Sequence, residues 1–241
     1  MDAVILAAGR GQRMVGLAKP FYKPLLEING LPLIAYAVEY ASAAGAAHVT
    51  VVASYENFGD IRDALHRYSG WVTIDVQETP SGPGHATLVG MGRSRGGATM
   101  LLMSDNIMDQ DAVVAMATNC RIHSMDAIGV RSVTREQASR FTRLRFNYGK
   151  PFTFVEGIEV TDRDLWIDDT VKVWCGPVIF DTEIAYDILS TAWNTHDKET
   201  EMKIGTHLNS ILRSPFSICD VKAFDVGVPA VYMAHTNTGS L

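Results

Sequence analysis

The chain has 241 residues, of which 47% are hydrophobic and 20% charged, a composition typical of a folded globular protein. Its formal net charge of −6 argues against a general nucleic-acid-binding or membrane-binding surface, so any basic site must be local. No stretch approaches the roughly 20 apolar residues that a membrane span requires. The first residues lack the basic region of a signal peptide, and the three cysteines lack C-x-x-C spacing. These features predict a cytoplasmic protein with reduced thiols.

Apolar runs alternate with segments of helical periodicity through the first half of the chain. We expect strands at Ala3–Leu6, Val49–Ala53, Trp71–Val76, Thr99–Met103 and Ala127–Val133. We expect helices between them at Leu33–Ala44, Ile61–Tyr68, His85–Arg95 and Ala112–Asn119. Strand–helix alternation at this pitch predicts an α/β fold with a mostly parallel sheet that helices cover on both faces.

The periodicity changes after about residue 135. Alternating apolar residues between Phe141 and Phe180 predict antiparallel strands or hairpins. Helices are expected again at Glu183–Trp193 and Lys198–Leu212, and a last strand at Ser217–Phe224. We interpret residues 136–241 as an addition to the first sheet, so that residues 1–241 form a single domain.

The opening segment places a glycine-rich turn directly after an apolar strand. Gly9 and Gly11 leave backbone N–H groups open to an anion, because no Cβ obstructs them. Arg13 and Lys23 supply the positive charge that a polyphosphate needs. The pattern therefore favours phosphate binding over an ordinary glycine turn.

Two common phosphate-binding motifs do not fit this segment. The dinucleotide fingerprint G-x-G-x-x-G fails because Met14 stands where the third glycine belongs. The P-loop pattern fails because Leu17 and Ala18 replace its Lys and its Ser or Thr.

Two aspartates follow apolar strands directly and are candidate metal ligands. Asp105 comes after Met100–Met103, and Asp225 comes after Val221–Phe224. Mg²⁺ takes one or two carboxylates and leaves its remaining positions to water and phosphate. The alternative for each aspartate is a structural role in a helix cap or a turn.

A third candidate segment is the glycine-rich loop from Gln77 to His85. The Gln77 amide offers a donor and an acceptor, which match the O4/N3–H edge of uracil or thymine, although a flipped amide also fits cytosine. Gly82 allows the backbone to approach a base closely. Residues 7–14, 77–85 and 104–107 all follow predicted strands. We therefore expect these turns to meet at the carboxyl edge of the sheet, where α/β folds bind their ligands.

Together these segments resemble the sugar-1-phosphate nucleotidyltransferase family, in particular glucose-1-phosphate thymidylyltransferases and N-acetylglucosamine-1-phosphate uridylyltransferases. Residues 2–33 are similar to the amino-terminal signature of that family. Residues 102–106 resemble L-x-G-D-N with Ser104 in place of Gly, and residues 225–229 are similar to D-x-G-T-P. Residues 77–86 resemble Q-x4-G-T-G-H-A with Pro83 in place of Thr.

The resemblance implies a three-layer α/β/α, nucleotide-diphospho-sugar transferase-like fold, in which residues 1–135 bind a nucleotide and residues 136–241 bind an acceptor. The implied reaction is a Mg²⁺-dependent transfer of a nucleotidyl group from UTP or dTTP to a sugar 1-phosphate, with release of pyrophosphate. It implies catalytic roles for Arg13, Lys23 and Asp105, and Mg²⁺ ligation by Asp105 and Asp225. The implied nucleotide-binding residues are Leu6, Ala8, Gly9, Gly11, Arg13, Gln77 and Gly82.

The match to the acceptor-binding motifs is weaker. The implied acceptor-binding residues are Glu156, Lys172, Trp174 and Gly176. Trp174 occupies the place of an amide-binding Asn and is equally well explained as a core aromatic residue. Thr142 stands where the uridylyltransferases have glycine, which argues against N-acetylglucosamine 1-phosphate as the acceptor.

Two alternative functions stay open at this point. A cytidylyltransferase for phosphocholine or another small phosphorylated alcohol has the same amino-terminal motif, and Trp166, Trp174 and Tyr148 could line its acceptor pocket. A non-catalytic nucleotide-sugar-binding protein would share the fold without needing the charged residues. We expect an NTP and a phosphorylated small molecule as partners, no nucleic acid and no membrane, and the chain is compatible with a homo-oligomer.

Overall fold

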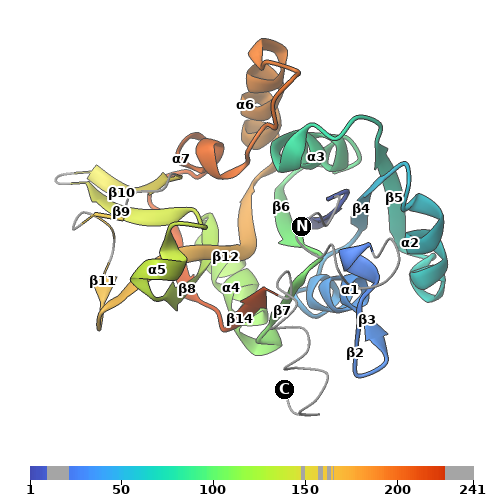
Figure 1. Cartoon of the computed structure of the whole chain (residues 1–241), viewed down its shortest axis with the longest axis horizontal. Helices are drawn as coiled ribbons and strands as arrows, with labels where there is room; N and C mark the ends of the chain where they lie inside the picture. Colours follow the sequence, from blue (N-terminus) through green and yellow to red (C-terminus); the bar gives the residue numbers. More distant parts are fainter. Residues whose placement is uncertain (10–21, 148–149, 157–159, 162–163, 165, 226–241) are drawn as a thin grey trace.

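A mixed sheet runs through the centre of the molecule (Figure 1). The computed structural model describes residues 1–9, 22–147, 150–156, 160–161, 164 and 166–225. The strands of the main sheet are β1 (Asp2–Ala7), β4 (Val49–Ser54), β5 (Val72–Gln77), β6 (Ala98–Met103), β8 (Ala127–Val133), β9 (Arg143–Asn147), β10 (Lys150–Val155), β11 (Trp166–Ile167), β12 (Thr170–Asp181) and β13 (Ser217–Asp220). Their order is β10-β9-β12-β6-β1-β4-β5, while β8 pairs with β12 and β13, and β11 pairs with β12.

The sheet is parallel on one side and mostly antiparallel on the other, where β13 and β8 form a parallel pair. Strand β1 pairs in parallel with β4 and β6, and β4 pairs in parallel with β5. Strand β12 is antiparallel to β6, β8 and β9, and β10 is antiparallel to β9. The predicted α/β fold, with a mostly parallel sheet and an antiparallel region in the second half, is confirmed.

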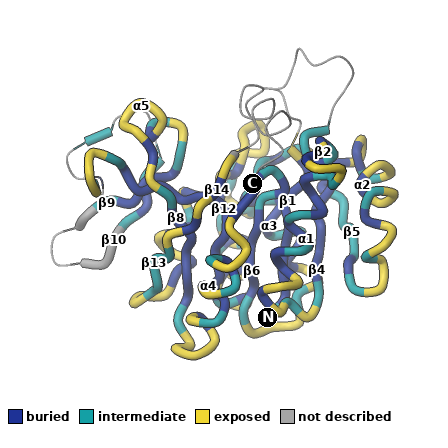
Figure 2. Tube along the Cα trace, turned by 90° about the horizontal axis from the view of Figure 1, so that it is seen from below, coloured by how far each residue is buried: buried dark blue, intermediate teal, exposed yellow. Residues whose placement is uncertain are grey.

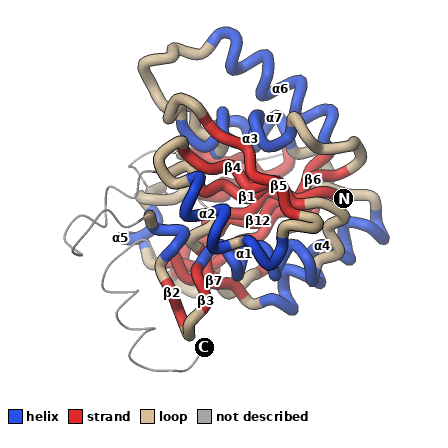
Figure 3. Tube along the Cα trace, turned by 90° about the vertical axis from the view of Figure 1, so that its right-hand side faces the viewer, coloured by secondary structure: helices blue, strands red, loops and turns tan. Residues whose placement is uncertain are grey.

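Helices cover both faces of this sheet, with α3, α6 and α7 above the strands and α1 and α4 below them in Figure 3. The helices are α1 (Leu33–Ala43), α2 (Phe58–Ala64), α3 (Gly82–Met91), α4 (Gln110–His123), α5 (Arg135–Ala138), α6 (Thr182–Thr195) and α7 (Leu208–Ile211). Side chains of β1 alternate between the two faces. Ala3, Ile5 and Ala7 join a core that includes α1 and α4, whereas Val4 and Leu6 join a second core that includes α3 and α6. The protein therefore has three layers, as predicted.

Aspartate caps fix the starts of two helices that flank the sheet. The Asp109 carboxylate accepts a hydrogen bond from the backbone N–H of Asp111 at the start of α4 (3.1 Å). The Asp181 carboxylate accepts one from the N–H of Ile184 at the start of α6 (3.1 Å). These bonds satisfy N–H groups that have no partner within the helix.

The parallel strands β1, β4, β5 and β6 all end at the same edge of the sheet. The amino terminus, where β1 starts, lies at the lower edge in Figure 2, so these strands end toward the upper edge.

Two small sheets accompany the main one, β2 (Glu27–Ile28) with β3 (Leu31–Pro32), and β7 (Asn106–Met108) with β14 (Ala223–Asp225). Short 3-10 turns are η2 (Lys23–Leu25), η3 (His66–Tyr68) and η4 (Gly205–His207). The three cysteines are free thiols, as predicted.

Two predicted elements near the carboxyl end are wrong. The helix expected at Lys198–Leu212 is limited to η4 and α7, because the backbone N–H and C=O of Met202 bond to another loop instead of to helix neighbours. The strand expected at Ser217–Phe224 is divided into β13, which pairs with β8, and β14, which pairs with β7. Both errors arise from tertiary hydrogen bonds that the apolar pattern does not encode.

Candidate active site

Lys23 and Asp105 form an ion pair at the carboxyl edge of the parallel strands. Lys23 begins the turn η2, and Asp105 lies in the turn between β6 and β7. The side chains are 15% and 31% exposed, so solvent and a ligand can reach both groups. The N–H of Ser104 donates to the carbonyl of Leu6 (3.2 Å) and holds this turn against the end of β1. The structure therefore brings together two of the three predicted catalytic residues.

Asp225, the second predicted metal ligand, lies near the same turn because its strand pairs with β7. Strand β14 pairs antiparallel with β7 so that Asp225 lies opposite Asn106, the neighbour of Asp105. The Asn106 amide donates to the carbonyl of Cys175 (2.8 Å) and so joins the turn to β12. Gly176 of β12 has φ +120°, and an added Cβ would lie 2.5 Å from the Asn106 amide nitrogen. The predicted acceptor residue Gly176 thus lies against Asn106, the neighbour of Asp105.

Gln77 is only 4% exposed, and its amide nitrogen forms hydrogen bonds within the predicted base-binding loop. It donates to the carbonyl of Gly82 (3.0 Å) and lies 3.1 Å from Nδ1 of His85. Burial, and to a smaller extent the charge of Lys198, lowers the pKa of His85, which favours the neutral ring that can accept this hydrogen bond. Gln77 therefore fixes the shape of the loop, and recognition of a base edge by its amide stays a prediction.

Asn57 is a buried site residue that sequence analysis did not identify. Its side chain accepts a hydrogen bond from the N–H of Ser54 (2.8 Å) and donates one to the carbonyl of Ala7 (2.9 Å). This fixes the end of β1 directly before Ala8 and Gly9, two of the predicted nucleotide-binding residues. Leu6 and Ala8 are buried, whereas an added Cβ on Gly9 would meet nothing within 4 Å. An S-x-x-N sequence directly after an apolar strand is the signal that could have indicated Asn57.

The predicted acceptor residues form separate contacts. The Thr142 hydroxyl donates to Oε1 of Glu156 (3.0 Å), and Nζ of Lys203 lies 3.5 Å from Oε2 of the same carboxylate. Lys172 forms an ion pair with Asp220. Trp174 is 8% exposed, belongs to a hydrophobic core, and donates its indole N–H to the carbonyl of Pro177 (3.3 Å). Contact of these residues with an acceptor stays a prediction.

Two predicted residues, Gly11 and Arg13, lie outside the described residues. Within the described ranges, no group of three or more His, Cys, Asp or Glu residues could hold a metal ion. A Mg²⁺ site of one or two carboxylates completed by phosphate and water does not require such a group.

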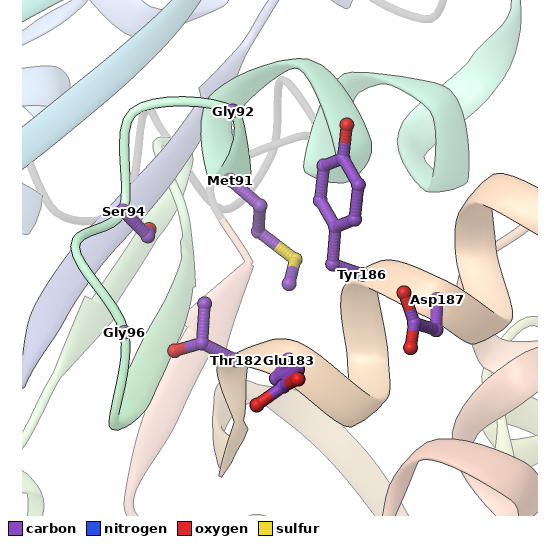
Figure 4. Close-up of a pocket in the computed structure, with 8 residues that line it drawn as sticks. All are labelled: Met91, Gly92, Ser94, Gly96, Thr182, Glu183, Tyr186 and Asp187. Carbon is purple, nitrogen blue, oxygen red and sulfur yellow. The ribbon is translucent and has the colours of Figure 1, made fainter.

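A separate cavity of about 370 Å³ lies at the opposite edge of the sheet, before β6 begins (Figure 4). Its lining comes from the end of α3, the following loop and the first turns of α6: Met91, Gly92, Ser94, Gly96, Thr182, Glu183, Tyr186 and Asp187. None of the predicted site residues lines this cavity.

A solved UDP-glucose pyrophosphorylase complexed with UDP-glucose has this fold, with a TM-score of 0.76, 20% identity, and coverage of 98% of this chain and 97% of that one. Residues 3–202 match the MobA-like NTP transferase domain, and the chain belongs to this family. The predicted resemblance is confirmed.

Curated relatives match parts of the chain. The bifunctional protein GlmU of Anaeromyxobacter dehalogenans is 29% identical over 68% of this chain and 34% of its own length. A 2-aminoethylphosphonate cytidylyltransferase of Lancefieldella rimae is 41% identical over 32% of this chain and 31% of its own length. An N-acetylmuramate alpha-1-phosphate uridylyltransferase of Neisseria meningitidis is 35% identical over 49% of this chain and 52% of its own length. The matches thus span about a third to a half of these relatives. In the part of the chain that the structure describes, no helix is long and apolar enough to cross a membrane.

Proposed function

We propose that this protein transfers a nucleotidyl group from a nucleoside triphosphate to a sugar 1-phosphate and releases pyrophosphate, with UTP or dTTP as the favoured donor. The ion pair of Lys23 and Asp105 at the carboxyl edge is the observation that carries this proposal. It places a cation that can bind phosphate beside a carboxylate that can bind a metal, on the side of the sheet where this fold class binds ligands.

In the proposed reaction, a phosphate oxygen of the acceptor attacks the α-phosphorus of the NTP. The bond from that phosphorus to the oxygen bridging the α- and β-phosphates breaks, and pyrophosphate leaves. The acceptor oxygen is already anionic, so the step requires positioning and charge neutralisation more than a general base. We assign the β- and γ-phosphates to Arg13 and the backbone N–H groups of residues 9–11, and the α-phosphate and incoming oxygen to Lys23.

Asp105 and Asp225 are the residues that we propose to hold Mg²⁺. The donor set fits this ion, because both side chains are carboxylates and the backbone pairing of β7 and β14 places Asp225 opposite Asn106, the neighbour of Asp105. When bound, Mg²⁺ would neutralise charge on the triphosphate oxygens.

The aromatic residues argue for a sugar phosphate over phosphocholine. A trimethylammonium group needs open aromatic faces. The face of Trp166 is covered by the Arg135 guanidinium, 5.7 Å from the ring centre, and its N–H donates to Thr161. Trp174 is buried in the core, and Tyr148 lies outside the described residues. The similarity to a cytidylyltransferase for aminoethylphosphonate, a smaller phosphorus-containing acceptor, keeps cytidylyl transfer as the second candidate.

A pyrophosphate-release assay tests the proposal directly. Each of the common NTPs is combined with Mg²⁺ and with glucose 1-phosphate, N-acetylglucosamine 1-phosphate, phosphocholine or 2-aminoethylphosphonate. We expect turnover with UTP or dTTP and a sugar 1-phosphate, and its loss in EDTA. A preference for CTP with a phosphorylated alcohol or phosphonate would establish the second candidate instead.

Variants of the charged pair give the second arm of the test. Asp105→Asn and Lys23→Ala should each lower kcat by about two orders of magnitude, because Lys23 would neutralise phosphate charge directly and Asp105 would hold the Mg²⁺ that does so. Asp63→Asn and Arg67→Ala, at exposed positions on α2 and η3, are the matched controls and should retain activity. Near-normal turnover of Asp105→Asn would refute the assignment of the site.

A further inference from the structure

Residues 202–205, here called the bridging segment, link the predicted base-binding loop to the predicted acceptor carboxylate. At one end, the N–H of Met202 donates to the carbonyl of Ser81 (2.8 Å), and the carbonyl of Met202 accepts from the N–H of Gly84 (2.7 Å). Met202 is 1% exposed, so these bonds are shielded from water. Both the backbone N–H and the carbonyl of Met202 are thus hydrogen-bonded to the loop.

Two glycines of the loop make this approach possible. An added Cβ on Gly82, which has φ +86°, would lie 2.8 Å from both the backbone nitrogen and the carbonyl oxygen of Met202. An added Cβ on Gly84 would lie 2.8 Å from the same carbonyl oxygen. Real Cβ atoms essentially never come this close. The backbone of the loop is therefore packed directly against the backbone of Met202.

The other end of the segment fixes Glu156. A Cβ added to Gly205 would overlap Oε1 of Glu156 and Oγ of Thr142, so the carboxylate rests directly on the backbone of Gly205. Lys203 lies 3.5 Å from the other carboxylate oxygen, and its side chain is 61% exposed. Together with the hydroxyl of Thr142, these contacts set the direction of the carboxylate.

The chain after the segment is anchored to the strand that precedes Glu156. Asn209 of α7 accepts from the N–H of Phe154 (2.6 Å) and donates to the carbonyl of the same residue (2.8 Å). Strand β10 ends at Val155, directly before Glu156. This pair of bonds therefore fixes the position of α7 relative to the Glu156 carboxylate. The segment between Met202 and Gly205 is thus held at both ends by elements of the two predicted subsites.

We propose that the bridging segment is a positioning element that couples the two subsites, so that a bound nucleotide raises the affinity for the acceptor. This inference rests on the proposed function. A bound nucleotide orders the loop and so restrains Met202. Three residues further on, Gly205 of the same segment restrains the Glu156 carboxylate in the orientation that accepts hydrogen bonds from acceptor hydroxyls. Because coupling is reciprocal, the acceptor raises the affinity for the nucleotide by the same factor. Gly205 and Lys203 act through Glu156.

The test measures coupling in the full chain without turnover. The probes are the α,β-methylene analogue of UTP with Mg²⁺ and glucose 1-phosphate, and each dissociation constant is measured with and without the other probe. In the wild type we expect a coupling factor of about 10, within the usual range for linked sites. In Gly205→Ala, the analogue alone should bind within about twofold of wild type, while the coupling factor falls toward 1 and the acceptor KM rises about tenfold.

Gly59→Ala is the matched control, since an added Cβ there meets nothing within 4 Å and Gly59 lies on α2. Lys203→Met provides a variant that retains the fold if Gly205→Ala does not, and it should raise the acceptor KM without weakening binding of the analogue. Equal losses for both probes, or an unchanged coupling factor in both variants, would overturn the inference. If the wild type binds the analogue and turns over UTP but shows no coupling, the inference alone fails. If it does neither with any NTP, the proposed function fails as well.

Discussion

At the residue scale, the hydrogen bond between Gln77 and His85 makes the stability of the protein depend on pH. Nδ1 of His85 can accept from the Gln77 amide only while the ring is neutral, and burial lowers the pKa of His85 below its usual value near 6.5. A group whose pKa is lower in the folded state contributes its stability in full above the unfolded value. That contribution is lost as the pH falls through the folded value.

We therefore expect the melting temperature of the wild type to fall between pH 7 and pH 5 more steeply than that of His85→Gln. Thermal unfolding of both proteins across this range measures the difference. His207, whose pKa burial also lowers, is present in both proteins, so its contribution cancels. His123→Gln, at the exposed end of α4, is the control and should follow the wild type. Parallel curves for wild type and His85→Gln would contradict the expected role of the ring.

The place of Asp105 at the carboxyl edge of the sheet was predictable from the sequence, whereas the partners of Gln77 and Glu156 were not. Carboxyl ends of parallel strands share an edge, so residues that directly follow them converge whatever their separation along the chain. The contacts of Gln77 with His85, and of Glu156 with Gly205, depend instead on the conformations of loops. No periodicity in the sequence encodes those conformations.

At the scale of elements, α3 approaches the sheet closely because Gly90 faces the strands. An added Cβ on Gly90 would lie 2.5 Å from a methyl group of Val4 on β1 and 2.9 Å from one of Val52 on β4. This close contact also places the amino-terminal end of α3, with its glycine-rich turn, beside the end of β5. Helix packing and loop position are therefore linked.

We expect Gly90→Ala to destabilise the protein by about 1–3 kcal/mol, the usual cost of overpacking a core, although alanine favours the helix itself. Urea unfolding measures the change in free energy. Gly90→Ala combined with Val4→Ala should recover part of the loss, since Val4 supplies the nearest methyl group. Gly92→Ala, at the end of the same helix with its nearest contact at 3.2 Å, is the milder control. A neutral effect of Gly90→Ala would show that α3 can shift away from the sheet.

The sequence pattern predicted elements well where one face of a helix or strand is buried regularly. Leu33–Ala44 and Thr99–Met103 agree with α1 and β6 to within one residue. Helix α3 begins at Gly82, earlier than the predicted His85, because Pro83 and two glycines occupy its first turn and weaken the helical signal. Residues 198–204 were expected to be helical, but the hydrogen bonds of Met202 to the α3 turn outweigh local helix preference.

At the scale of the whole molecule, the two halves of the sequence interleave in one sheet. Strand β12, from the second half, lies between β6 and β8 from the first, and β13 adds to the other side of β8. An ion pair with a buried carboxylate also connects the two halves of the sequence. The carboxylate of Asp126, at the entry to β8, is 2% exposed and accepts from the backbone N–H (2.8 Å) and the guanidinium (2.7 Å) of Arg213. The same arginine reaches Asp181 at the start of α6 (3.2 Å).

This arrangement predicts that residues 1–241 unfold in one cooperative transition, since neither half retains a complete sheet without the other. Far-UV circular dichroism and tryptophan fluorescence should give the same midpoint, because the signals report on both halves. Arg213→Ala leaves the buried carboxylate of Asp126 without its guanidinium partner, which should cost about 2 kcal/mol and lower the midpoint by roughly 4–8 °C while the transition stays single. Arg62→Ala, whose partner Asp63 is exposed on α2, should change the midpoint little. Two separated transitions in the wild type would mean that the halves fold independently despite their shared sheet.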